Sequence, residues 1–194
     1  MTSRASLGGD ERLRLFLALR LPDPALDLLE AWQRERLPPE RVRTVPREHL
    51  HVTLAFLGHR PAGELSGIVG ALREAAAGIR EALRLTPVRY RETRGVAMLV
   101  LDDEHGRAEA LAGDLQERLE RLGVYRREGR RWLPHLTVAR FRERPGLRLE
   151  PPNRGTYVLI PSDASAYLSR LRPGGAQYEI LESVPLKAVP LGGQ

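Results

Sequence analysis

The chain of 194 residues contains no cysteine, and Lys187 is its single lysine. The lack of cysteine excludes disulfide bonds, a cysteine nucleophile and thiolate metal sites, and it fits a reducing cytosol. No apolar stretch approaches the roughly 20 residues of a membrane-spanning helix, and the first residues lack the apolar run of a signal peptide. We therefore expect a cytoplasmic protein that does not associate with membranes.

The composition is that of a folded domain. Hydrophobic residues make up 42% of the chain and charged residues 29%, which excludes a disordered protein. The length suits one domain of two small lobes. We expect this domain to span 12–187, with disordered tails at 1–11 and 188–194.

Positive charge is concentrated in one segment. The formal net charge is +6, and a genomic preference for arginine codons explains the overall excess about as well as a function does. Residues 126–144, however, hold seven arginines against two glutamates. A cationic rim there would attract a phosphodiester or an RNA end.

The hydrophobic pattern alternates between helical and strand periods. Helices are expected at 22–37, 61–83 and 104–122. Strands are expected at 12–21, 41–45, 50–57, 85–92, 96–101, 134–141, 157–160, 164–171 and 177–184. The order predicts an α+β fold of two pseudo-symmetric lobes, each an antiparallel sheet with helices outside, which face each other across a central cleft.

The pattern His-x-Thr occurs twice, at 51–53 and at 135–137, each time in an apolar strand and once in each half of the chain. Alternate side chains of a strand point to opposite faces, so the histidine and threonine of each copy share one face. One copy alone is weak as a signal, but two copies at matching strand positions indicate a shared pocket.

Two imidazoles and two hydroxyls suit chemistry on a phosphate. His51 and His135 could act as a general acid and a general base on opposite sides of a phosphodiester. Thr53 and Thr137 could donate hydrogen bonds to its non-bridging oxygens. This chemistry requires neither a metal nor a cofactor. The remaining histidines, 49, 59 and 105, are interpreted as a strand-start rim residue, a loop residue and a solvated helix-start residue.

Both motifs and their flanking sequences, RLFLALRLP, HLHVTLAFLG, RRWLPHLTVAR and YLSRLRPGGAQYEILESVPL, resemble the 2H phosphoesterases, a family named for two His-x-Thr motifs. Within it the chain is similar to the bacterial RNA 2′,3′-cyclic phosphodiesterases, also known as 2′-5′ RNA ligases. The resemblance implies a monomer with the 2H phosphoesterase fold that hydrolyses RNA 2′,3′-cyclic phosphate ends to 2′-phosphomonoesters. Ligation is expected to be a weak side activity.

The resemblance also implies residue roles. His51 would be the general acid that protonates the leaving 3′ oxygen, and His135 the base that activates water. Phe56 would stack on a base and Arg140 would contact phosphate. Strict alternation puts both of these on the face opposite the histidines, so the strands must twist, bulge or end, or else Phe56 belongs to the core and Arg140 to the rim.

Two residues just before the second motif are further candidates. Arg131 and Trp132 could hold the RNA end by charge and stacking. The alternative interpretation is a solvated arginine and a core tryptophan.

Other functions remain open on the same scaffold. They are a phosphodiesterase for a small cyclic nucleotide, a 3′ RNA exonuclease, and a non-catalytic RNA-binding module. The size of the pocket separates the first two from the main hypothesis. The presence of both histidines and both threonines argues against the binding module.

Overall fold

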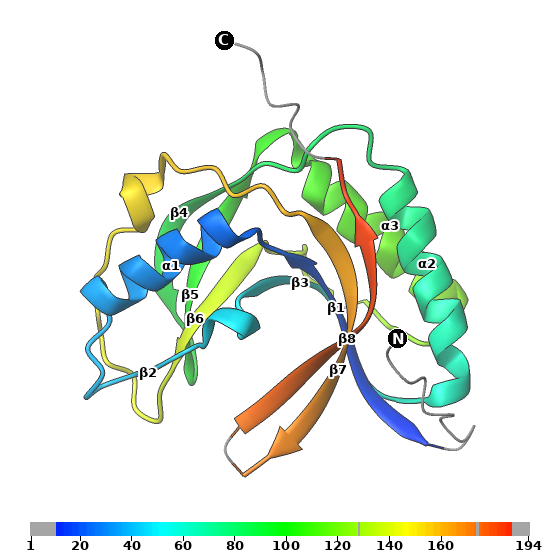
Figure 1. Ribbon diagram of the computed structural model, residues 1–194, viewed down its shortest axis with the longest axis horizontal. Coiled ribbons are helices and arrows are strands. Elements are labelled where there is room, and N and C mark those ends of the chain that lie inside the picture. Colours follow the sequence, from blue (N-terminus) through cyan, green and yellow to red (C-terminus); the bar gives the residue numbers. More distant parts are fainter. Residues whose placement is uncertain (1–10, 128, 174, 188–194) are drawn as a thin grey trace.

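A computed structural model of the chain describes residues 11–127, 129–173 and 175–187 (Figure 1). The tails expected at 1–11 and 188–194 lie outside the described residues, apart from residue 11. No helix in the described part of the chain is long and apolar enough to cross a bilayer.

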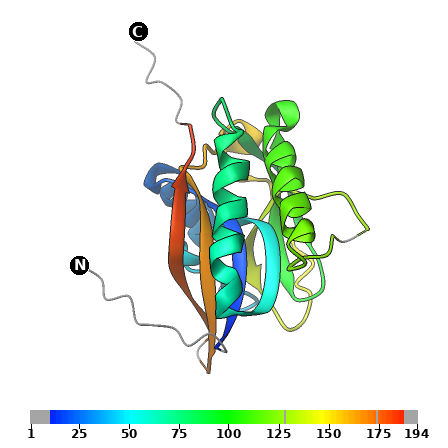
Figure 2. The same cartoon turned by 90° about the vertical axis from the view of Figure 1, so that its right-hand side faces the viewer.

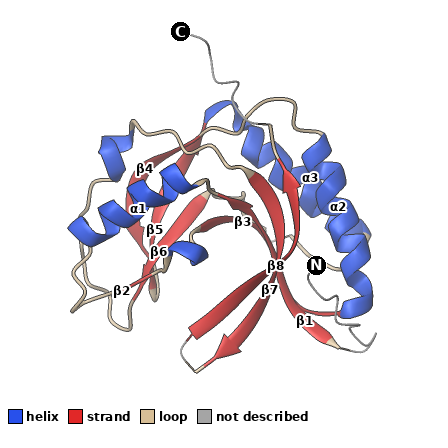
Figure 3. Ribbon diagram, in the orientation of Figure 1, coloured by secondary structure: helices blue, strands red, loops and turns tan. Residues whose placement is uncertain are grey.

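The strands form one antiparallel sheet, curled so that one face is concave (Figure 3). Its order is β4-β5-β6-β3-β1-β7-β8, and β2 pairs with β6. The strands are β1 (Arg12–Arg20), β2 (Arg43–Thr44), β3 (His51–Pro61), β4 (Leu85–Glu92), β5 (Val96–Asp103), β6 (His135–Arg140), β7 (Asp163–Arg172) and β8 (Gly175–Pro185). The fold is α+β, as the sequence predicts, and the two expected lobes are the halves of this sheet on either side of the β3–β6 seam.

In the described residues, three α-helices cover one face of the sheet: α1 (Asp23–Arg36), α2 (Leu65–Ala77) and α3 (Arg107–Arg121). Helix α1 lies over the half with β4, β5 and β6, whereas α2 and α3 lie side by side against the other half (Figures 1 and 2). Their apolar sides form one core with the leucines of β1, at 13, 15, 17 and 19. The intervening Phe16 and Ala18 point to the concave face, where they form a small cluster with Tyr167.

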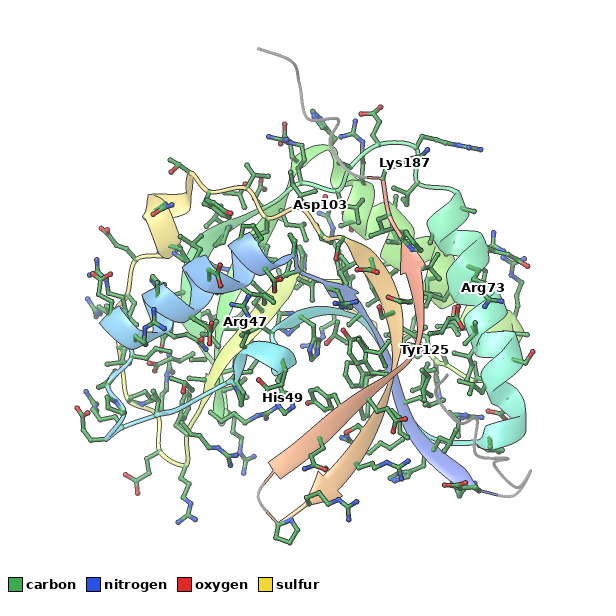
Figure 4. All side chains as sticks on the ribbon, viewed as in Figure 1. Arg47, His49, Arg73, Asp103, Tyr125 and Lys187 are labelled. Carbon is green, nitrogen blue, oxygen red and sulfur yellow. The ribbon has the colours of Figure 1, made fainter. Side chains whose placement is uncertain are left out.

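Local chemistry explains where the helices begin. Pro24 lies in the first turn of α1, where the missing N–H of proline costs nothing. The carboxylate of Asp103 accepts the backbone N–H groups of Ala108 and Glu109, at 3.2 and 2.7 Å, in the first turn of α3 (Figure 4). A negative charge there also favours the helix dipole.

Strand β3 is longer than predicted, because Gly58 does not end it. The strand runs to Pro61 and stays paired with β1 up to Arg12. Gly58 adopts a φ of 66° beside a register shift, a backbone conformation that glycine allows at a bulge within a strand. His59, predicted in a loop, is therefore a strand residue opposite Arg14.

Several other expected elements are shorter, among them the strand expected at 41–45, which is only Arg43–Thr44. Helix α2 ends at Ala77 rather than near 83, where Gly78, a poor helix former, follows. The strand expected at 157–160 is only a bridge between Leu159 and Leu85. Pro161 follows and has no N–H with which to extend the ladder.

Both motif strands contain an extra residue three positions after the histidine, and β3 has a second one at Leu57. The register of β3 with β1 skips Leu54, and the register of β6 with β5 skips Val138. After such a β-bulge, the alternation of faces shifts by one residue. Leu54 and Ala55 are accordingly both buried in the core, and so are Val138 and Ala139.

A buried carboxylate anchors the loop that follows β6. Glu92 accepts the backbone N–H groups of Gly146 and Leu147, at 2.9 and 2.8 Å, and the hydroxyl of Tyr90 at 3.0 Å. Arg144 donates to the same carboxylate at 3.2 Å from a largely exposed position. Leu147 and Leu149 of this loop pack against the main core, so Glu92 fixes the loop to that core.

We predict that Glu92→Ala lowers the free energy of unfolding by about 2–4 kcal/mol, because two backbone N–H groups lose their acceptor. Arg144→Ala is the matched control and should cost less than about 1 kcal/mol, as an exposed ion pair does. Urea unfolding of both variants measures the difference. Equal losses would show that the backbone contacts of Glu92 are unimportant.

Candidate active site

The two His-x-Thr motifs lie side by side at the β3–β6 seam. Among the described residues, one registered pair joins β3 to β6. It pairs Val52 with Leu136, the central residues of the two motifs. Antiparallel counting then sets His51 opposite Thr137 and Thr53 opposite His135. The histidines occupy one diagonal of this square and the threonines the other, with diagonal separations of roughly 7–8 Å.

The four side chains line a cavity of about 720 Å³ on the concave face. The 3-10 turn η1 (Arg47–His49) contributes His49, which points into the opening between this turn and the β7–β8 hairpin (Figure 4). Strand β8 contributes Tyr178. The charged lining comprises Arg14, Arg43, Arg140, Arg172 and Glu48. A cavity of this size and charge suits an anionic nucleotide.

The turn that carries His49 is held against α1 by a group of ion pairs. Arg47 donates to Asp23 at 2.8 Å, to Asp27 at 2.6 Å and to Glu30 at 2.9 Å (Figure 4). These carboxylates raise the pKa of Arg47. The charge of Arg47 is therefore committed to α1, and its contribution to the site is to place the turn.

Aromatic rings surround the imidazole of His51. Phe16 stacks on it with 4.9 Å between ring centroids, Tyr167 lies at 5.8 Å, and Tyr178 meets it edge-on at 5.7 Å. Burial lowers the pKa of His51 to about 4, although a backbone hydrogen bond with His49 opposes the shift. Burial also lowers the pKa of His49.

His135 is held in one tautomer. Its Nδ1 lies 2.8 Å from the carbonyl oxygen of Leu133. Because a carbonyl can only accept, Nδ1 must carry the proton in this contact. In the neutral ring Nε2 is then the atom that can accept a proton, which suits a general base.

The two bulges bring Phe56 and Arg140 to the concave face, which resolves the conflict with strict alternation. Phe56 of β3 pairs with Phe16 of β1, and its side chain is half exposed. The Arg14 guanidinium lies 4.7 Å from the centroid of the Phe56 ring. Arg140 pairs with Val96 of β5 and lines the cavity. Phe56 is therefore not a core residue, and both side chains lie beside the motifs.

Arg131 and Trp132, which were expected to hold the RNA end, do not line this cavity. Arg131 forms an ion pair with Glu109 of α3. The indole N–H of Trp132 donates to the backbone carbonyl of Thr53 at 3.0 Å, and its ring packs against the core. The alternative interpretation, a solvated arginine and a core tryptophan, describes them better. Trp132 supports the first motif strand from behind.

Sequence reasoning missed the aromatic side of the site. Phe16 and Tyr178 reach His51 through β1 and β8, far from either motif in the chain, and no local pattern marks them. His49 lies two positions before His51, so a regular strand would place both side chains on one face. That spacing could have identified His49 as a residue of the site. In the described part of the chain, no three His, Asp or Glu side chains gather closely enough to hold a metal ion.

Comparison with known proteins is consistent with this geometry. Residues 21–151 match the family model of the 2′-5′ RNA ligase superfamily. An RNA 2′,3′-cyclic phosphodiesterase of Thermus thermophilus is 32% identical over 184 residues, 90% of this chain and 91% of that protein. One of the same name from Escherichia coli is 39% identical over 67 residues, 33% of this chain and 38% of that protein. The crystal structure of E. coli LigT complexed with 3′-AMP superposes with a TM-score of 0.73 at 25% identity, covering 92% of this chain and 100% of LigT.

We predict that the His51 imidazole titrates with a pKa of about 4 in the ligand-free protein, and that adding 2′-AMP raises this pKa. Burial disfavours the charged ring, whereas a neighbouring phosphate anion favours it. NMR titration of the imidazole resonances measures both values. Phe16→Ala should move the free value back toward about 6.5 by admitting water. A free value near 6.5 in the unmodified protein, the ordinary value for histidine, would contradict the burial effect.

Proposed function

The chain belongs to the 2′-5′ RNA ligase superfamily, the 2H phosphoesterases, and we propose that it hydrolyses the 2′,3′-cyclic phosphate at the 3′ end of RNA to a 2′-phosphomonoester. The observation that carries this proposal is the square of two histidines and two threonines on one cavity wall. A single chain supplies all four groups, so the proposed reaction requires no second copy, and a monomer remains part of the proposal. Its cysteine-free composition fits the cytoplasm.

The diagonal histidines suit in-line displacement at phosphorus. Nε2 of His135 takes a proton from water as the water oxygen bonds to phosphorus. On the far side the bond to the 3′ oxygen breaks, and His51 gives that oxygen a proton. Thr53 and Thr137 donate hydrogen bonds to the non-bridging oxygens, where negative charge increases. Both proton transfers belong to side chains, and the proposal therefore needs no metal.

The low pKa of His51 fits a general acid that becomes charged only when substrate binds. In the free protein, burial against Phe16 and Tyr167 favours the neutral ring. A phosphodiester anion in the cavity reverses this preference, because an opposite charge nearby stabilises the imidazolium. Binding of the substrate therefore favours the protonated form of His51, which is the form that acts as the acid.

A second cavity supports RNA over a mononucleotide as substrate. This arginine groove has a volume of about 900 Å³ and adjoins the catalytic cavity, with which it shares Arg43 and Arg140. Its charged lining comprises Arg41, Arg43, Arg140, Arg142 and Arg144 against Glu40 and Glu143. A mononucleotide would fill only the catalytic cavity, whereas the phosphates of a longer strand would reach the groove.

We predict that His51→Ala and His135→Ala each remove nearly all turnover, while Thr53→Ala and Thr137→Ala lower it roughly ten- to a thousandfold. The assay uses a short RNA ending in a 2′,3′-cyclic phosphate, in excess EDTA, with identification of the product end. His59→Ala, an exposed strand histidine away from the cavity, is the matched control.

Each outcome of this assay is informative. A 2′-phosphate product that needs both motif histidines supports the proposed acid and base. A 3′-phosphate product would show that the other ester oxygen leaves. RNA binding without any turnover would favour a binding module, and loss of activity in EDTA would contradict metal independence.

We also predict that Arg142→Ala raises KM for a hexanucleotide with a cyclic phosphate end by three- to tenfold and leaves KM for 2′,3′-cyclic AMP unchanged. The slope of log KM against log salt should fall by roughly 0.7 for each lost phosphate contact. Arg73→Ala, on the outer face of α2, is the control (Figure 4). Equal effects on both substrates would favour a phosphodiesterase for small cyclic nucleotides.

A further inference from the structure

We propose that two buried glutamines, Gln33 of α1 and Gln116 of α3, are positioning residues that keep Arg140 and Phe56 on the substrate side of their strands. Neither glutamine lines the catalytic cavity. Each acts through the β-bulge that follows a His-x-Thr motif. The proposal rests on the function proposed above.

Each glutamine binds the backbone of one bulge. Nε2 of Gln116 donates to the carbonyl oxygen of Leu54 at 2.9 Å. Nε2 of Gln33 donates to the carbonyl oxygen of Val138 at 2.8 Å and to that of Val45 at 3.0 Å. Leu54 and Val138 are the extra residues that lie three positions after the motif histidines. An extra residue disturbs the regular ladder, and its carbonyl is then open to donors from outside the paired strands. The carbonyl of Val138 accepts the backbone N–H of Val45 at 2.9 Å as well as the Gln33 amide, whereas Gln116 donates to that of Leu54.

The same contact is made independently in the two halves of the molecule. Helices α1 and α3 lie over different halves of the sheet and are far apart in the chain (Figure 1). Both side chains are buried, Gln33 at 4% and Gln116 at 8% exposure. Polar residues are rare in the described core, where the others are Glu92, Ser165 and Ser169. A glutamine placed twice against an equivalent carbonyl therefore points to a shared role.

That role follows from the parity of the strands. Without an extra residue, alternation would turn Phe56 and Arg140 toward the helices, away from their histidines. With it, the position five residues after each histidine returns to the concave face, where both side chains line the cavity. An amide that donates to the bulge carbonyl stabilises the bulged register over the regular one, and at Val138 it does so together with the backbone N–H of Val45. Gln116 thus acts through Phe56, and Gln33 acts through Arg140.

This specific pairing separates positioning from general stabilisation. Gln116 should affect the stacking contact of Phe56 and leave the phosphate contact of Arg140 intact, and Gln33 should do the reverse. The catalytic histidines and threonines precede the bulges. Losing either glutamine should therefore raise KM much more than it lowers kcat.

The test is a set of double-mutant cycles on the RNA substrate. Gln116→Met keeps the side-chain length and removes the N–H donors. We expect it to raise KM three- to tenfold alone and in the Arg140→Ala background, but by less than twofold in the Phe56→Ala background. Gln33→Met should show the opposite pattern, with its effect lost only in Arg140→Ala.

Equal effects of each methionine variant in both backgrounds would overturn the proposal and leave the glutamines a purely structural role. Gln33→Asn and Gln116→Asn, whose shorter amides cannot reach the carbonyls, replace any methionine variant that does not fold. The same double-mutant cycles are repeated with a binding measurement, the Kd of an RNA ending in a 2′-phosphate. This readout needs no turnover, so a failure of the proposed reaction is distinguished from a failure of the positioning role.

Discussion

The site depends on one registered pair, Val52 of β3 with Leu136 of β6, where the two halves of the sheet meet. Both side chains are fully buried, which directs their neighbours on each strand to the concave face. Because the side-chain period of a strand is two, a slip of one residue would turn a whole motif into the core. The burial of Val52 and Leu136 thus determines the face on which the motif histidines and threonines lie.

The bulges extend what each strand can supply. In a regular strand the histidine and threonine would be followed on the same face by an alanine, Ala55 in β3 or Ala139 in β6, which offers no functional group. One extra residue before each alanine instead returns the position five residues after the histidine to the concave face. Each strand then contributes acid–base chemistry, a hydroxyl and either the ring of Phe56 or the charge of Arg140. Glutamine amides from α1 and α3 donate to the carbonyls of the two extra residues, and the backbone N–H of Val45 also donates to that of Val138.

Burial and charge act together on His51 at the phosphate site. The aromatic cluster of Phe16 and Tyr167 removes water from His51 and favours its neutral form. Arginines line the same cavity, and Arg140 further disfavours a second positive charge on the imidazole. An anion in the cavity opposes both effects, because an opposite charge nearby stabilises the protonated imidazole. The site therefore favours a phosphate more strongly than its individual groups would in water.

The sequence alone determined the α+β class, most of the helices and strands, and the face shared by each histidine and threonine, because these follow from local periodicity. It also contained a further signal for the bulges, since HVTLAF and HLTVAR share an alanine directly after the extra residue. Only the tertiary structure decided that the Trp132 indole donates to the backbone of β3, that β3 continues past Gly58, and that Tyr178 reaches His51. Those outcomes depend on which strands and helices become neighbours, and contacts between distant segments leave no periodic trace in the chain.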